Sequence, residues 1–244
     1  MQLKTAIKYN LTILRKPLLI FYGICFVIYA FMLILFLSLD NAKFNNGGVI
    51  QGMGFLFPMG IMFYVEFFKM FLQNGISRKT MFKSSIISLL LCAVTMSVID
   101  GIVTILFENS NVLTSLPYQI YGDFITPQPK FIVFAEIVFM DFAMYFFMAV
   151  LGYFFGILFS RMTRLLRMIV PIGLLFIIFI LTIIDTTLTD HRIISAVASF
   201  FMYITGFKND GNINYLSISG LCFAGIFTLF SWLLFRRATI KSLN

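Results

Sequence analysis

The chain alternates between long apolar runs and short polar or charged segments. A helix needs about 20 apolar residues to cross a bilayer core about 30 Å thick. Runs that meet this length occupy residues 18–39, 49–71, 84–107, 131–160, 168–187 and 215–235. The fourth run exceeds one span, so residues 131–141 are expected to project into the outer interface. Continuous runs differ from the alternating polarity of β-barrel strands. The pattern therefore predicts an all-α integral membrane protein with six spans in a single domain, residues 1–244.

The N-terminal segment, residues 1–16, has a different pattern from the six runs. Leu3, Ile7, Leu11 and Leu14 recur at helical spacing, while the lysines favour other faces. This spacing is typical of an amphipathic helix that lies in the inner membrane interface. A disordered basic tail is the alternative.

Two segments between the runs are expected to lie outside. Residues 108–130 contain three prolines and are expected to be irregular. Residues 193–207 are apolar and aromatic but too short to cross a bilayer. They indicate either a re-entrant or interfacial helix or a loop helix that packs on its neighbours.

Composition supports a membrane location. Of the 244 residues, 60% are hydrophobic and 11% are charged, whereas soluble domains average about 45–50% apolar and about 25% charged residues. A net charge of +8 is also found in proteins that bind nucleic acid, but the positions of the charges indicate membrane orientation instead. Most basic residues fall on one side of the predicted spans: Lys4, Lys8, Arg15, Lys16, Lys69, Arg78, Lys79, Lys83, Arg161, Arg164, Arg167, Arg236, Arg237 and Lys241. Basic residues mark cytoplasmic loops, so both termini are predicted to be cytosolic.

Catalytic motifs are missing from the sequence. The single histidine, His191, has no cysteine or second histidine near it, which excludes a histidine-pair metal site. The P-loop pattern of ATPases is also missing. Cys25, Cys92 and Cys222 lie inside apolar runs. We therefore expect a non-catalytic chain that binds no metal or cofactor itself. A serine hydrolase that uses His191 is the remaining enzyme hypothesis.

Acidic residues within the runs are candidates for function, because an ionisable group at mid-bilayer costs roughly 2.5–3.5 kcal/mol or more. Asp100, Glu136, Asp141 and Asp185 fall near the predicted outer helix ends. The simple interpretation is that they are hydrated there. The functional interpretation places Asp100, Glu136 and Asp141 on a substrate path.

Two further features concern the helices themselves. Glu66 lies late in the second run with Lys69 at i+3, which favours a pair within the helix, or a role in fixing the segment that follows. Gly152 and Gly156 form a small-xxx-small pattern that permits close helix contact.

The link between the second and third runs, residues 73–83, is short, basic and partly apolar. Gly75 can end the preceding helix and Ser77 can cap a new one. Residues 77–83 would then form a short coupling helix, with Arg78 and Lys79 exposed and an exposed Met81–Phe82 pair on or near the interface side. This surface fits a partner's groove. The alternative is that it anchors the chain to lipid head groups.

Here the chain resembles the permease subunits of ABC-2 type exporters. In that family an acid late in the second span precedes a Gly-[IV]-[ST]-Arg-[KR] coupling segment. The matching residues are Glu66, Gly75, Ile76, Ser77, Arg78 and Lys79. The small size and Phe- and Lys-rich composition look most like permeases of the bacterial plasma membrane that export amphipathic peptides, the phenol-soluble modulins.

The resemblance implies a multi-pass permease that moves hydrophobic or amphipathic cargo outward. Two permease chains, identical or related, would form the membrane unit. Two separate ATPase subunits would bind ATP and Mg²⁺ and would act on the coupling segment, which comprises Glu66, Gly75, Ser77, Arg78, Lys79, Met81 and Phe82. The alternative is an ATP-independent membrane protein, such as a peptide-immunity or channel-like protein, that depends on residues 189–214 instead.

Overall fold

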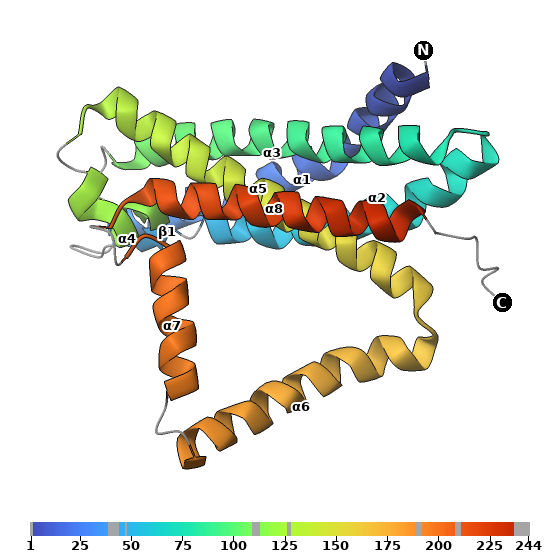
Figure 1. Cartoon of the computed structure of the whole chain (residues 1–244). Coiled ribbons are helices and arrows are strands. Elements are labelled where there is room, and N and C mark those ends of the chain that lie inside the picture. The colour runs from blue at the N-terminus through green and yellow to red at the C-terminus, as the bar shows by residue number, and fades with distance from the viewer. Residues whose placement is uncertain are drawn as a thin grey trace.

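The computed structural model describes residues 2–38, 44–46, 48–108, 113–125, 128–188, 192–207 and 211–236. The predicted helical fold is confirmed (Figure 1). The long helices are α1 (Gln2–Ser38), α2 (Gly48–Gln73), α3 (Arg78–Glu108), α5 (Lys130–Arg161), α6 (Arg164–Leu188) and α8 (Ile213–Arg236). The short elements are β1 (Phe44–Asn46), β2 (Leu113–Ser115), α4 (Leu116–Ile125) and α7 (Arg192–Ile204). By length and composition, five of the described helices can cross a membrane: α1, α2, α3, α5 and α8.

Helix α5 lies at the centre of the bundle and packs against α2, α3 and α8. Its contact with α2 is close because α5 carries glycine at the crossing. A Cβ added at Gly152 would collide with the carbonyl oxygen of Phe57, and one at Gly156 would lie 3.0 Å from the carbonyl oxygen of Ile61. The close helix contact predicted from the Gly152–Gly156 spacing is therefore confirmed.

The N-terminal segment departs from the prediction in two respects. It is helical, but it forms one continuous helix with the first apolar run, and Pro17 lies inside that helix. Its buried residues are Ala6, Asn10 and Leu14, so Leu14 is the one member of the expected face that is buried. The reason is tertiary: Tyr9 makes ring contacts with Phe67 and Phe71 of α2, with centroids 6.1 Å apart in each pair, and these contacts set the rotation of the helix.

The segment expected to be irregular, residues 108–130, is ordered over part of its length. Strand β2 pairs in parallel with β1, and α4 follows directly, with Pro117 in its first turn, where proline is tolerated. The hydroxyl of Tyr121 donates to the carbonyl of Thr205 at 2.7 Å. Burial raises the pKa of Tyr121 to about 12. The expectation of an irregular segment was wrong because proline positions alone do not distinguish a loop from the start of a helix.

Helices α5 and α8 run in the same direction. Asn214, near the start of α8, donates to Glu136 near the start of α5, and Arg161, at the end of α5, donates to Leu234 near the end of α8. The chain must therefore return between them. Helix α6 makes this return and lies apart from the bundle, while α7 leads back from α6 to the start of α8 (Figure 1). The 25 residues of α6 extend about 37 Å. Large apolar side chains along it are exposed, including Ile172, Phe176 and Phe179.

Candidate functional site

The link between α2 and α3 is a short turn with a defined structure at each end. Gly75 adopts the left-handed conformation at φ +68°. Its N–H donates to the Leu72 carbonyl at 3.1 Å, and the N–H of Ile76 donates to the Phe71 carbonyl at 3.0 Å. These two bonds form a Schellman motif, which satisfies the last carbonyls of a helix. The predicted break at Gly75 is confirmed.

The new helix is capped by Ser77, as predicted. The Ser77 hydroxyl oxygen accepts a hydrogen bond from the Thr80 N–H at 3.3 Å, and the Met81 N–H donates to the Ser77 carbonyl at 3.0 Å. However, the helix does not stop after two turns. It continues as α3 to Glu108. The expectation of a separate coupling helix over residues 77–83 was therefore wrong: these residues are the first turns of a long helix, since Lys83 is followed without a breaker by an apolar run.

The face that this link presents to solvent is basic. Arg78, Lys79 and Lys83 are exposed, as was predicted for the first two. The Met81–Phe82 pair was expected to be exposed as well, and this was wrong. Met81 is 2% exposed and Phe82 is 8% exposed. Both side chains belong to the core of the bundle.

Phe82 anchors the start of α3 to two other helices. Its ring centroid lies 5.1 Å from Trp232 and 5.7 Å from Phe235, both on α8, and 6.0 Å from Tyr153 on α5. Aromatic pairs at such distances add to the free energy gained by burial. Met81 and Phe82 therefore hold the start of α3 against α5 and α8. A partner that docks on the link would contact its basic side chains and the turn at Gly75 instead.

Glu66, the candidate acid of the second span, is exposed on α2. Its predicted pair with Lys69 falls on a side chain outside the part of the structure that is described. Glu66 lies two turns before the end of α2 at Gln73, which places an acid close to the basic face of the link.

Two arginines cap the C-terminal end of α8, a feature that the sequence analysis did not predict. Arg78 Nη1 donates to the carbonyl of Arg236 at 3.2 Å, and Arg161 Nη2 donates to the carbonyl of Leu234. The last carbonyls of a helix have no partner within it and carry partial negative charge, which cations stabilise. The start of α3 and the end of α5 thus meet the end of α8.

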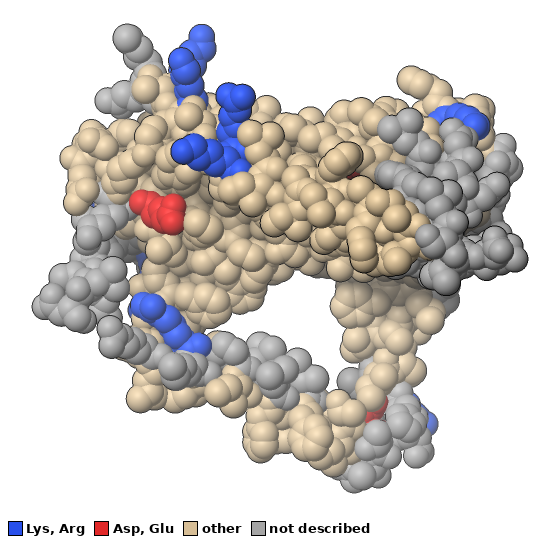
Figure 2. Space-filling model, turned by 180° about the vertical axis from the view of Figure 1, so that it is seen from behind, with Lys and Arg blue, Asp and Glu red and all other residues tan. Residues whose placement is uncertain are grey.

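We call this end of the bundle the link end, defined by Gly75, Arg78, Arg161 and Arg236. Tyr9 contacts Phe71, so the N-terminal turns of α1 lie there too. Figure 2 shows basic side chains gathered at this end of the molecule. The segments that were expected to share one side of the membrane therefore lie together in the fold.

A second polar cluster lies inside the bundle, toward the opposite end. Asp100 of α3 accepts hydrogen bonds from two tyrosine hydroxyls. Tyr22 of α1 donates to Oδ1 at 3.2 Å, and Tyr145 of α5 donates to Oδ2. Tyr22 also lies 3.3 Å from the Met96 carbonyl. Three helices therefore converge on one carboxylate.

Asp141 lies one turn before Tyr145 on α5 and interacts electrostatically with Asp100. It is 0% exposed, and neither of its carboxyl oxygens has a hydrogen-bond partner in the described part of the chain. The interpretation that Asp141 is simply hydrated was wrong. Helix α5 is central to the bundle, so its inward side chains do not reach water.

Glu136, the third acid of the predicted substrate path, faces α8 instead. Its Oε1 accepts a hydrogen bond from Asn214 Nδ2 at 3.3 Å. The structure thus brings Asp100 and Asp141 together. Glu136 instead contacts Asn214 of α8. Asp185 is also buried, and its Oδ2 accepts a hydrogen bond from the Ile194 N–H at 2.9 Å, which joins α6 to α7.

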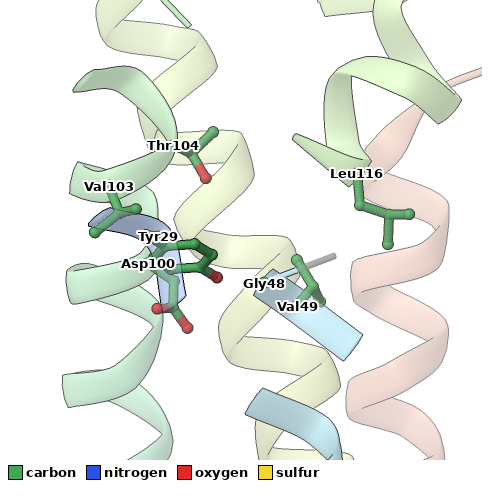
Figure 3. A pocket seen from close by; sticks show the side chains of 7 residues that line it. All are labelled: Tyr29, Gly48, Val49, Asp100, Val103, Thr104 and Leu116. Carbon is green, nitrogen blue, oxygen red and sulfur yellow. The ribbon is translucent and has the colours of Figure 1, made fainter. Parts of the chain in front are cut away.

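A small pocket lies beside Asp100 (Figure 3). Its volume is about 10 Å³, and it is lined by Tyr29, Gly48, Val49, Asp100, Val103, Thr104 and Leu116. This is about the space that one water molecule needs. The lining comes from α1, α2, α3 and α4, which meet toward the opposite end. Asp100 therefore lines a small space at the end of the bundle opposite the link end.

The described residues include no group of three or more His, Cys, Asp or Glu side chains that could hold a metal ion. His191, on which the enzyme hypothesis depended, lies outside the described residues. Comparisons with protein-family models, with curated proteins and with solved structures find no match for the chain.

Proposed function

We propose that the chain is the permease subunit of an ATP-driven exporter of the ABC-2 type, worked by a separate ATPase. The observation that carries the proposal is the link between α2 and α3. It is exposed and basic, with a fixed turn at Gly75 and a capped helix start at Ser77. Its sequence also matches the coupling segment of that family.

Three features of the link suit it to transmit force. Few residues separate α2 from α3, so the turn allows little movement of one helix end relative to the other. Met81 and Phe82 tie the first turns of α3 into the core, and Arg78 ties them to the end of α8. A push on the link would therefore move α3 and α8 together. In this account Gly75, Ser77, Arg78 and Lys79 form the docking surface, whereas Met81 and Phe82 transmit the motion inward.

The proposed topology has six spans and both termini in the cytosol of a bacterial cell. Helix α6 is the additional span. Its support is geometric: α5 and α8 run in the same direction, which requires a crossing between them, and α6 has both the length and the apolar surface for it. The link end would then be the cytosolic end, in agreement with its basic residues.

The complete exporter would contain a second permease chain and two ATPase subunits that bind ATP and Mg²⁺. The cargo would be hydrophobic or amphipathic, and peptides are the class that the resemblance favours. Asp100 and Asp141 are the acids best placed to face a path through the bundle, because they lie on adjacent helices α3 and α5.

Cysteine labelling tests the orientation on which this function depends. In a variant without Cys25, Cys92 and Cys222, Lys79→Cys is expected to react with a membrane-impermeant maleimide only after the cells are permeabilised. Lys130→Cys, exposed at the start of α5, is the matched control and should react in intact cells. Reaction at position 79 from outside would overturn the proposal and would favour the ATP-independent alternative.

A further inference from the structure

Two carboxyl groups meet inside the bundle, away from the proposed coupling surface. Asp100 has a hydroxyl donor on each oxygen, from Tyr22 and Tyr145. Asp141 has none among the described residues, although it is fully buried. The two acids are close enough to interact electrostatically. Two like charges in an apolar interior repel strongly, and a buried charge without a partner costs far more than a buried neutral group.

Among the described side chains, no cation interacts with this pair to balance its charge. The titratable groups that interact with it are Tyr22 and Cys25 of α1 and Tyr145 of α5. Gln51 of α2 accepts from Tyr29 and is uncharged. Helix α8, on another side of α5, has no acidic or basic residue before Arg236. Within the described side chains, the charge of the pair can be reduced only by a bound cation.

We propose that Asp100 and Asp141 form a proton-binding site, in which Asp141 holds the proton and Asp100 remains the anion. The assignment follows from the hydrogen bonds. Two O–H donors stabilise a carboxylate at Asp100, whereas a carboxyl group that accepts no hydrogen bond, as at Asp141, is stable only when neutral. The observation that indicates a bound proton is the side chain of Asp141, which is fully buried and has no hydrogen-bond partner among the described residues. A metal cation fits less well, because it needs several oxygen ligands, and neither carboxyl oxygen of Asp141 has a hydrogen-bonding partner among the residues that the structure describes.

The pocket beside Asp100 would let a proton reach the pair. It has room for about one water molecule, and Asp100 forms part of its lining (Figure 3). A hydronium ion at this position would transfer its proton to the Asp100 carboxylate and revert to water. The O–H bond at Asp100 would then break as the Asp141 carboxylate forms its own, so the charge of the pair changes from −2 to −1. Buried acids that relay protons in this way occur in pumps and transporters. The inference does not depend on the proposed ATPase partner.

Infrared spectroscopy of the purified chain in lipid nanodiscs tests the site directly. The wild type is expected to show the C=O stretch of a protonated carboxylic acid, with a downshift in D₂O. Asp141→Asn, which keeps the shape of the side chain, should lose this band. Glu136→Gln on the same helix is the matched control and should retain it. A band of equal size in Asp141→Asn would overturn the proposal.

Two further measurements keep the proposal testable if Asp141→Asn does not fold. Tyr145→Phe removes a donor from Asp100, so the proton should become shared and the band should shift in frequency. An unshifted band would contradict the assignment of the anion to Asp100. Replacing choline by sodium at constant pH should leave the wild-type band unchanged. If sodium removes the band, the pair binds a metal cation rather than a proton, and the proposal is wrong.

Discussion

Replacing Lys79 and Lys83 by glutamate is expected to abolish coupling to the ATPase while the chain remains folded. Both side chains are exposed, and at i and i+4 they share one face of α3. Reversing both charges turns a basic docking face acidic, and like charges across an interface cost several kcal/mol. ATP hydrolysis that co-purifies with the permease should therefore fall at least about tenfold, since each 1.4 kcal/mol is a factor of ten in binding.

The matched control for this variant is Lys130→Glu with Arg192→Glu. It makes the same change in net charge with two exposed residues, located at the starts of α5 and α7. Co-purifying ATPase activity should stay at the wild-type level in the control. Equal loss in both variants would show that net charge, rather than the link, governs the interaction. Full activity in the Lys79–Lys83 variant would count against a docking role for the link.

Replacing Phe82 by alanine is expected to destabilise the fold strongly. The side chain is buried against Tyr153, Trp232 and Phe235, and a buried Phe→Ala substitution typically costs about 3–5 kcal/mol. Trp232 is the only tryptophan and lies next to the cavity that the substitution creates. Thermal unfolding followed by tryptophan fluorescence should therefore show both a lower midpoint and a changed folded-state emission.

Phe131→Ala is the control for this second prediction, because Phe131 is 80% exposed. Substitutions at such sites usually change the free energy of unfolding by about 0.5 kcal/mol or less. A Phe82→Ala protein that unfolds like the wild type but fails to bind the ATPase would restore the original expectation, that Phe82 itself docks in the partner.

The turn at the link shows what the sequence can predict. Gly75 and Ser77 act through local chemistry, a left-handed backbone and a hydroxyl cap, so both roles could be read from residue type and position. The burial of Met81 and Phe82 could not. It depends on which face of α3 meets α8 and α5, and nothing in residues 73–83 specifies that rotation.

The same distinction applies to the acids and to the arginines. Asp100 and Asp141 could be recognised as unusual from their place in apolar runs, but their pairing requires that α3 and α5 be neighbours. The bonds of Arg78 and Arg161 to the end of α8 join residues separated by 158 and 73 positions. The continuity of α1 could have been predicted from the sequence, because Pro17 is the one helix-breaking residue between the N-terminal segment and the first apolar run.

Photo-crosslinking from position 79 in membranes of the native host tests the central claim most directly. A benzophenone amino acid placed there, with position 130 as the control, distinguishes a protein partner from lipid head groups. We expect position 79, but not position 130, to give one protein adduct with an ATP-binding protein, at a yield that changes when ATP is added. Adducts with lipid alone at position 79 would contradict the account.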